Sequence, residues 1–560
     1  MRCVGSALTP VCVYIEPPSK EIHDVISDPI FSIVTHYLEG STLKDADLSR
    51  ASASKAIAIF LMGNKFSVDP DDEDAKTILQ HYSIKRYLSS RDSCDPLFCL
   101  QMIRPENRRH LAVNDSDDDK EVVVCLNEVK MGVIAKSCMF PGTGTLLFNL
   151  LTSFADNDED GGDSGDEDLE GGIDSDMDGS DDDDDDIGWI QEYQKGCDWE
   201  IYTTELADVF EGAKFGLLAH QLYNKMGIVL FALRVRELKG KGAVHVLLNP
   251  AEYRIPSNDK YYVEGFVIAK NKASSDLSFT SMSGSHSIHT IVGNVIAKTQ
   301  EVGSNVIRRQ SLAVGARGLP TLPAMGGAKA VGWQEILGRY EHSEVSHNQQ
   351  EARQNMEDEH LRRNFFIREK PREYLEALVE TALLEEFPNM LGHTIVIAKS
   401  VSNLFDFIQP LRAKYLGLLK HIVVLYPHDI PQNVWRRISI FDGVLVVKGS
   451  PLEEGDIRRA GIFRAAKVVL LAEPNSMDTQ NARLSALADA DAIFTYHTVR
   501  RLNEKAQIVI EIVQPTNVGY LDPTLTTNTH HGDFKFTPQF ANGMLFTSSV
   551  LDAIVCQVSP

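Results

Sequence analysis

The chain has 560 residues, of which 43% are hydrophobic and 24% charged, so it has enough apolar residues to form cores and is not disordered throughout. Lys and Arg number 55 against 79 Asp and Glu, and the formal net charge of −24 argues against a nucleic-acid groove or a general binder of anionic membranes, because both need basic faces. The segment 156–186 holds 18 of the acidic residues and no Lys or Arg, which leaves a net charge of only −6 for the rest of the chain.

The eight cysteines are scattered and include no CxxC pair, so we expect a reducing environment with neither a disulfide framework nor a zinc site. The first residues lack the basic and apolar regions of a signal peptide. Two long uncharged runs, 137–155 and 277–297, are interrupted by a Pro-Gly turn or crowded with Ser, Thr and His. We therefore expect no direct membrane span in this chain, and the chain alone to be soluble.

The chain contains an internal repeat, in which the same predicted elements occur twice in the same order. A β-branched run at 11–15, a Gly-Ser loop, a short helix with an acidic start and an apolar run at 56–61 recur in the same order at 422–471. Six residues are identical at a constant offset of 409, namely Gly40, Ser41, Leu43, Asp47, Arg50 and Ala51, which match Gly449, Ser450, Leu452, Asp456, Arg459 and Ala460. Further strands at 97–103 and 507–512 follow a second helix in each copy. This alternation predicts a doubly wound α/β fold that is present twice, and the first copy lacks the first strand that the second copy has.

The remaining segments are interpreted from their composition. We expect two helices around Pro141-Gly142, a helix start capped at 69–74, a helix at 371–387, and a small α+β lobe with strands at 227–233, 243–248 and 261–269. The predicted domains are a first Rossmann-like lobe at 1–120, a helical crossover at 121–154, an acidic disordered insertion at 155–198, the small lobe at 199–270, a flexible linker at 271–365, a second Rossmann-like lobe at 366–535, and the start of a second crossover at 536–560.

No enzymatic or nucleotide-binding motif stands out. The strand-to-helix turn at 393–403 contains no Gly, although a pyrophosphate needs Gly there for close approach of the backbone, and no P-loop occurs anywhere. We predict no nucleotide-binding residues and no catalytic residues.

The acidic insertion contains one spacing of acidic residues that is typical of a calcium-binding loop. Asp174, Asp176, Asp178 and Asp185 occupy positions 1, 3, 5 and 12 of a calcium-type loop with Gly179 at position 6. An Asp stands at position 8, where an apolar residue normally anchors the loop. This favours the alternative, a solvated acidic tract that condenses cations weakly.

Four stretches carry a family resemblance, namely Tyr37–Ala51, Gln101–Asn107, Leu404–Ala413 and Phe540–Asp552. The chain resembles the paired RCK (regulator of potassium conductance) domains that form the gating ring of calcium- or sodium-activated large-conductance potassium channels of the Slo family. The resemblance implies a first RCK domain at about 10–270 that lacks its opening strand and helix, and a second, truncated one at about 366–560. It also implies that this chain is a fragment of a longer channel.

The resemblance further implies where ions and subunits bind. Candidate regulatory cation ligands, for Ca²⁺ or Na⁺, are Glu205, Asp522 and Asp533, together with the four Asp residues of the acidic loop. The stretch Asp522–Asp533 has only two acidic residues where calcium-activated members carry a run of Asp, and several stretches are closer to the sodium-activated branch. The implied assembly and crossover residues are Leu146, Leu147, Leu150, Leu151, Phe540 and Phe546.

The leading hypothesis is therefore a non-enzymatic gating-ring portion of a cation-activated potassium channel, on the cytoplasmic face of a membrane. Its implied partners are a channel pore domain and three further copies in a tetrameric ring, with no nucleic acid. The alternatives are a stand-alone soluble RCK-like binding protein and an oxidoreductase, the latter disfavoured by the Gly-free turn.

Overall fold

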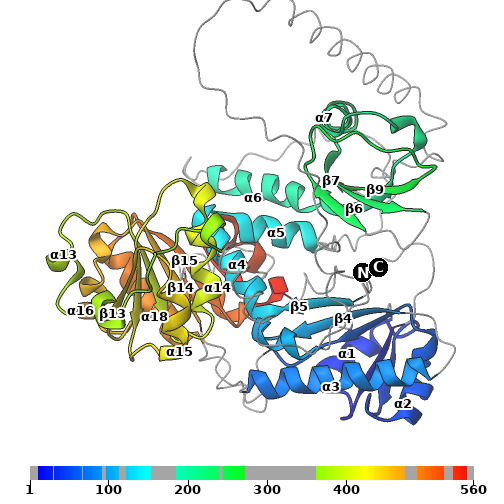
Figure 1. The fold of residues 1–560 in the computed structure, drawn as a ribbon, viewed down its shortest axis with the longest axis horizontal. Coiled ribbons are helices and arrows are strands. Elements are labelled where there is room, and N and C mark those ends of the chain that lie inside the picture. The colour runs from blue at the N-terminus through cyan, green and yellow to red at the C-terminus, as the bar shows by residue number, and fades with distance from the viewer. Residues whose placement is uncertain are drawn as a thin grey trace, which may run out of the picture. The chain divides into compact units, whose positions relative to one another are not determined.

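The computed structural model describes residues 10–29, 31–65, 67, 69–90, 96–111, 121–152, 184–238, 244–270, 361–472, 489–521 and 534–551. The chain divides into two compact units. The larger comprises Met1–Glu200, Arg368–Arg412 and Leu416–Pro560, and the smaller comprises Ile201–Ile367 and Ala413–Tyr415. The larger unit contains a first and a second α/β lobe (Figure 1).

The first lobe has two small parallel sheets. β1 (Val11–Tyr14) pairs with β2 (His36–Glu39), and β3 (Ala58–Leu61), β4 (Leu97–Met102) and β5 (Glu121–Cys125) form a separate sheet. The helical segments of the lobe are α1 (Lys20–Ser27), α2 (Asp45–Arg50), η1 (Ala53–Lys55), α3 (Pro70–Ser89) and η2 (Pro105–His110). The Asp69 side chain accepts hydrogen bonds from the backbone of Asp71 and Asp72, which confirms the predicted capped start of α3.

The second lobe has one seven-stranded parallel sheet in the order β10-β13-β12-β11-β14-β15-β16. Its strands are β10 (Leu378–Val379), β11 (Thr394–Ala398), β12 (Ile422–Tyr426), β13 (Val444–Lys448), β14 (Lys467–Leu471), β15 (Gln507–Ile512) and β16 (Leu545–Thr547). Its helical segments are α12 (Tyr374–Ala377), α13 (Leu383–Glu386), α14 (Leu404–Ile408), η4 (Pro410–Arg412), η5 (Lys414–Leu416), α15 (Gln432–Ile438), α16 (Glu454–Arg459), η6 (Ile462–Arg464), α18 (Ala490–Leu502), η7 (Pro515–Leu521), η9 (Phe534–Phe536) and α19 (Pro538–Ala541). Every residue of β11 is buried, as expected of a central strand covered on both faces.

The repeated residues form the same hydrogen-bond network in both lobes. Asp47 accepts from the Ser41 backbone at 3.0 Å and from Arg50 at 2.9 Å. At the matching positions, Asp456 accepts from Ser450 at 2.8 Å and from Arg459 at 2.9 Å. The preceding Gly is required because a Cβ at Gly40 or Gly449 would lie 2.9 or 2.5 Å from the carboxyl carbon of this Asp. The residues that are identical in the two copies therefore form the same hydrogen-bonded loop motif in both lobes.

A second repeated motif is a buried aspartate that accepts hydrogen bonds from the residues after one strand in each lobe. Asp74, which is 1% exposed, accepts hydrogen bonds from the backbone of Ile103 and from Asn107. Asp489, which is fully buried, accepts from the backbone of Val513 and from Asn517. Both carboxylates thereby satisfy buried donors at the turn that follows β4 or β15.

The smaller unit holds a four-stranded sheet in the order β6-β9-β7-β8 with a helix packed on it. The strands are β6 (Glu200–Glu205), β7 (Val229–Glu237), β8 (His245–Leu248) and β9 (Tyr261–Ala269), and the helical segments are η3 (Asp208–Phe210) and α7 (Phe215–Met226). α7 ends at Gly227, whose φ of +70° is a helix-ending conformation that glycine adopts readily. Strands occur at all three places predicted for the small lobe, and β7 continues to Glu237 instead of ending at 233.

In chain order, the first lobe is followed by α4 (Leu126–Met139), α5 (Thr143–Leu151) and α6 (Asp184–Cys197). We call α4 and α5 the crossover hairpin. None of the helices in the described parts of the chain combines the length and the apolar character that a membrane span needs.

Three secondary-structure predictions were wrong in detail. The predicted hairpin begins with strand β5, because the valines of Glu121–Cys125 pair with β4 before the helix starts. The predicted helix at 371–387 is instead α12, β10 and α13, since Leu378 and Val379 extend the sheet beside β13. The end of the segment predicted to be disordered, 184–197, forms α6, whereas residues 155–183 lie outside the described residues.

Candidate functional site

The predicted cation ligands are only partly within the described structure. Glu205 is exposed at the end of β6. Asp522, Asp533, Asp174, Asp176 and Asp178 lie outside the described residues, and Asp185 is in α6 with no description of its side chain. Over the described ranges, no three His, Cys, Asp or Glu side chains are grouped so that they could hold a metal ion. The cation site therefore remains a prediction.

The predicted assembly and crossover residues lie on α5, α19 and β16, and α5 contacts β16. Leu146 is 61% exposed, and Leu147, Leu150 and Leu151 are half-buried. Phe540 and Phe546 of the second lobe are buried, at 0% and 2% exposure. The buried face of α5 is formed instead by Gly144, Thr145 and Phe148.

This face of α5 packs against the last part of the second lobe. The Thr145 hydroxyl donates to the backbone carbonyl of Phe540 at 2.5 Å. The Phe148 ring meets the Phe540 ring edge to face, with 5.4 Å between centroids. A Cβ added at Gly543 would overlap with the backbone of Gly142, so the turn of the crossover hairpin approaches the second lobe as closely as two backbones allow.

A buried ion pair joins α4 to the sheet of the second lobe. Lys130 Nζ lies 3.0 Å from Glu511 Oε1, and the two side chains are 7% and 6% exposed. The other oxygen of Glu511 accepts from the backbone of Ala472 at 3.1 Å. At the equivalent position of the first lobe stands a neutral residue, Gln101, which donates to the backbone of Gly63. In the first lobe the neutral amide of Gln101 is sufficient at this position. The negative charge of Glu511 is therefore explained by its ion pair with Lys130 of α4.

The carboxyl end of α4 is also held by the second lobe. Lys467 of β14 donates to the backbone carbonyls of Cys138 and Met139, the last two residues of α4. A lysine is favourable there because the final carbonyls of a helix have no partner within it and carry partial negative charge. Burial lowers the pKa of Lys467 from its usual value.

Further along, α4 packs beside α14 (Figure 1). Two acidic side chains near this contact lie close to one arginine. Arg437 of α15 pairs with Glu106 of η2, lies 4.0 Å from Asp406, and covers the Phe405 ring at 4.5 Å. Burial raises the pKa of Asp406 to about 6; Arg437 opposes this shift, and Glu106 and Glu128 add to it. The contact between the lobes therefore contains a carboxyl group whose pKa burial raises to about 6.

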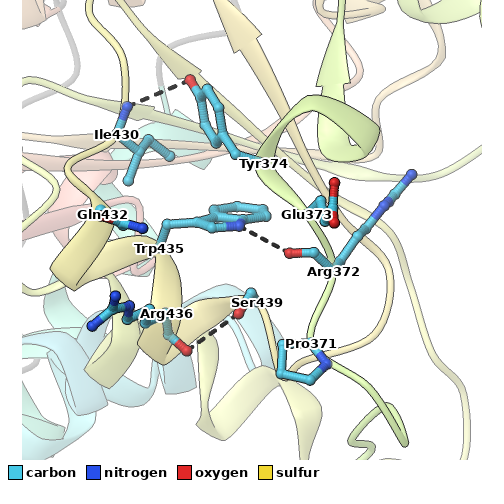
Figure 2. Close-up of a pocket in the computed structure, with 9 residues that line it drawn as sticks. All are labelled: Pro371, Arg372, Glu373, Tyr374, Ile430, Gln432, Trp435, Arg436 and Ser439. Atoms are coloured by element: carbon cyan, nitrogen blue, oxygen red, sulfur yellow. Dashed lines mark hydrogen bonds between the residues drawn. The ribbon is translucent and has the colours of Figure 1, made fainter.

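A separate pocket of about 430 Å³ opens beside α15. Figure 2 shows its aromatic surface, made by Trp435 and Tyr374, whose rings meet edge to face at 5.3 Å. The polar atoms of both are already used, because Trp435 Nε1 donates to the Arg372 carbonyl and Tyr374 Oη accepts from the Ile430 backbone. The pocket thus offers an aromatic surface, and Arg372, Glu373, Gln432, Arg436 and Ser439 also line it.

Sequence reasoning missed the polar residues that specify the contact between the lobes, namely Lys130, Thr145, Lys467 and Glu511. One signal was available, since Glu511 is a charged residue inside an otherwise apolar strand, and such a residue needs a buried partner. The identity of that partner, 381 positions away, follows only from the fold.

Comparison with known families gives two matches. Residues 8–130 and 389–510 match the family described as the calcium-activated potassium channel slowpoke-like RCK domain. Residues 121–233 match the calcium-activated BK potassium channel alpha subunit. The two segments of the first match cover most of the first lobe and much of the second, in agreement with the repeat.

Curated relatives match nearly the whole chain at low identity. The calcium-activated potassium channel slo-1 of Caenorhabditis elegans is 22% identical over 93% of this chain and 50% of its own length. Potassium channel subfamily T member 1 of Gallus gallus is 24% identical over 96% of this chain and 47% of its own length. The chain thus spans about half the length of these relatives.

Among solved structures, the human SLO3 gating ring superposes with a TM-score of 0.61 and 19% identity, over 98% of this chain and 77% of that chain. At this identity the likeness shows a shared fold. The prediction of two Rossmann-like RCK lobes is therefore confirmed.

Proposed function

From the matches to the slowpoke-like RCK domain and to potassium channels of this type, we propose that the chain is the cytoplasmic gating-ring portion of a cation-activated potassium channel. In this role it binds a cation and transmits a change in lobe packing to the pore of the channel. The observation that supports the proposal best is the pair of RCK lobes in one chain, joined by a crossover hairpin that docks on the second sheet. The family comprises channel domains rather than enzymes, so we propose a non-enzymatic role.

The mechanism needs two packings that a cation can bias. The contact between the crossover hairpin and the second lobe is suited to this, because a buried ion pair and further polar contacts accompany the apolar contact of Phe148 with Phe540. Polar contacts of this kind depend strongly on geometry, so a small shift of one lobe changes their energy substantially. We propose that cation binding shifts this contact and that the shift is the output of the sensor.

For the cation itself we propose Ca²⁺ or Na⁺, with Glu205 as the ligand candidate whose side chain is described. Glu205 ends β6, and on the neighbouring strand β9 Glu264 is already paired with Arg234. The Glu205 carboxylate is exposed and so is accessible to an ion. Asp522, Asp533 and the acidic loop remain separate candidates for cation binding.

For assembly we propose a homotetrameric ring, supported by apolar side chains exposed at equivalent places in the two lobes. Leu43 and Leu79 are 54% and 59% exposed in the first lobe, and Leu452 and Phe494 are 53% and 64% exposed in the second. Each leucine stands beside a long helix, because Ser83 of α3 donates to the carbonyl of Thr42 and Thr495 of α18 donates to that of Pro451. We call these residues the assembly pairs. Repeated exposed apolar groups favour contacts between copies of the same chain.

A chimeric channel tests the proposal. The chain replaces the matched region of the slo-1 relative, behind that channel's pore, and currents are recorded from inside-out patches with Ca²⁺ or Na⁺ on the cytoplasmic face. We expect the open probability to rise with one of the two cations, and Glu205→Gln to weaken the response while Glu211→Gln, an exposed acid in the same lobe, leaves it unchanged. A channel that opens but responds to neither cation would refute the sensing role.

A further inference from the structure

The pocket beside α15 is lined by three polar side chains that are not used in holding the fold together. Its volume of about 430 Å³ is within the usual range for sites of small molecules, and all of its lining residues belong to the second lobe. The three side chains are those of Glu373, Gln432 and Arg436, and all three are exposed. Over the described parts of the chain, none of them has a hydrogen-bond or ion-pair partner. They are therefore available to a ligand.

The other polar groups of the lining are already engaged. The Arg372 guanidinium donates to two backbone carbonyls, and the Ser439 hydroxyl donates to a third. The indole N–H of Trp435 donates to a carbonyl, and the hydroxyl of Tyr374 accepts from a backbone N–H. A ligand would therefore be oriented by the three unpartnered side chains, and the two rings would supply an apolar surface for its body.

The unpartnered charges lie on opposite sides of this aromatic surface. Figure 2 shows the Glu373 carboxylate on one side of the Trp435 indole. Gln432 and Arg436 lie on the other side, and their spacing of four residues places both on one face of α15. One end of the pocket thus has a negative group, and the other end has a positive group beside an amide.

We propose that this pocket binds a small zwitterion that has an aromatic body and one charge at each end. The ammonium group of the ligand pairs with Glu373. Its carboxylate pairs with Arg436 and accepts a hydrogen bond from the Gln432 amide, while its ring packs on Trp435. An α-amino acid belongs to a different class, because its two charged groups share one carbon. The site does not depend on the proposed cation-sensing role.

The test uses the full chain and three ligands that differ only at their ends. Para-aminomethylbenzoate carries both charges, para-methylbenzoate lacks the ammonium group, and para-methylbenzylamine lacks the carboxylate. We expect saturable one-to-one binding of para-aminomethylbenzoate by calorimetry, and at least about tenfold weaker binding of each analogue. Slower amide hydrogen exchange in Arg372–Tyr374 and in α15 should locate the bound ligand at the pocket.

Two variants test the two ends separately, both at exposed positions where the lobe should still fold. Arg436→Gln should weaken the binding of para-aminomethylbenzoate at least about tenfold and leave that of para-methylbenzylamine, which has no carboxylate, unchanged. Glu373→Gln should weaken the binding of para-aminomethylbenzoate to a similar degree, and should not weaken that of para-methylbenzoate. Arg86→Gln, at an exposed arginine of the first lobe, is the matched control and should bind all three ligands as the unmodified chain does.

Three results would each overturn the proposal. The first is the absence of saturable binding of para-aminomethylbenzoate. The second is equal affinity for the three ligands, which would mean that the charged ends are not recognised. The third is an equal loss of para-aminomethylbenzoate and para-methylbenzylamine in Arg436→Gln, because the carboxylate would then not be the group that this arginine binds.

Discussion

At the scale of single residues, the repeat identifies a strained position. Ser52 has φ of 54° in the first lobe, where the second lobe has Gly461. A side chain in the left-handed region costs roughly 1–2 kcal/mol, and glycine avoids this cost. The first lobe therefore tolerates a conformation that the second lobe adopts without strain.

We predict that Ser52→Gly stabilises the first lobe by about 1 kcal/mol, because the relief of strain exceeds the added entropy of the unfolded chain. Native-state hydrogen exchange of the amides in β3 and β4 measures the change. Ser49→Gly is the matched control, since this exposed position lies within α2 and the same substitution should destabilise by roughly 0.5–1 kcal/mol there. Equal effects of the two substitutions would refute the argument from backbone conformation.

Asp406 predicts a pH dependence of the contact between the lobes. Burial raises its pKa from 3.8 to about 6, with Arg437 opposing the shift and Glu106 and Glu128 adding to it. A carboxyl whose pKa is raised on folding favours the folded state fully below its unfolded pKa, and this stabilisation is lost as the pH rises through the folded value.

Compared with Asp406→Asn, whose side chain stays neutral, the unmodified chain should lose stability between about pH 4 and pH 7. Urea denaturation of both proteins across this range measures the difference, in which the titration of all other groups cancels. A difference that stays constant with pH would show that Asp406 keeps its ordinary pKa in the folded protein.

At the scale of elements, a buried ion pair is among the contacts that hold the crossover hairpin against the second lobe. Removing one member of a buried ion pair leaves an uncompensated charge and typically costs about 3–5 kcal/mol. We predict such a loss for Lys130→Met, because Glu511 remains buried opposite the new side chain. Circular dichroism during chemical denaturation measures it.

The sequence of the first lobe suggests a second substitution that should compensate for Lys130→Met. Gln101 occupies the position of Glu511 as a neutral amide, so Lys130→Met combined with Glu511→Gln should recover most of the lost stability. A double variant no more stable than Lys130→Met would mean that the ion pair is not the source of the loss.

The same elements show what the sequence could and could not predict. The identities from Gly40 to Ala51 were enough to predict both lobes, because a glycine that admits an aspartate against the backbone is a local requirement. β10 was missed because its two residues are a strand only through pairing with β13, and β5 because the valines of Glu121–Cys125 precede a helix directly. The contact between the lobes was missed because Lys130 and Glu511 are distant in sequence and no local pattern joins them.

At the scale of the whole molecule, the assembly pairs predict self-association. Burying a large apolar side chain contributes about 1.5–3 kcal/mol, so placing charges at Leu452 and Phe494 should raise the dissociation constant of the ring contact at least about 100-fold. Light scattering on Leu452→Asp/Phe494→Asp at rising protein concentration measures this. Leu375→Asp, at an exposed leucine outside the pairs, is the control and should leave assembly unchanged.

The central claim is that this chain forms a ring subunit whose packing responds to a cation. The most direct measurement is small-angle X-ray scattering of the purified chain during separate titrations with Ca²⁺ and Na⁺, at constant ionic strength kept with K⁺. The account predicts a tetramer whose radius of gyration changes saturably with one of the two cations. A monomer, or a ring whose radius is the same at all concentrations of both cations, would contradict it.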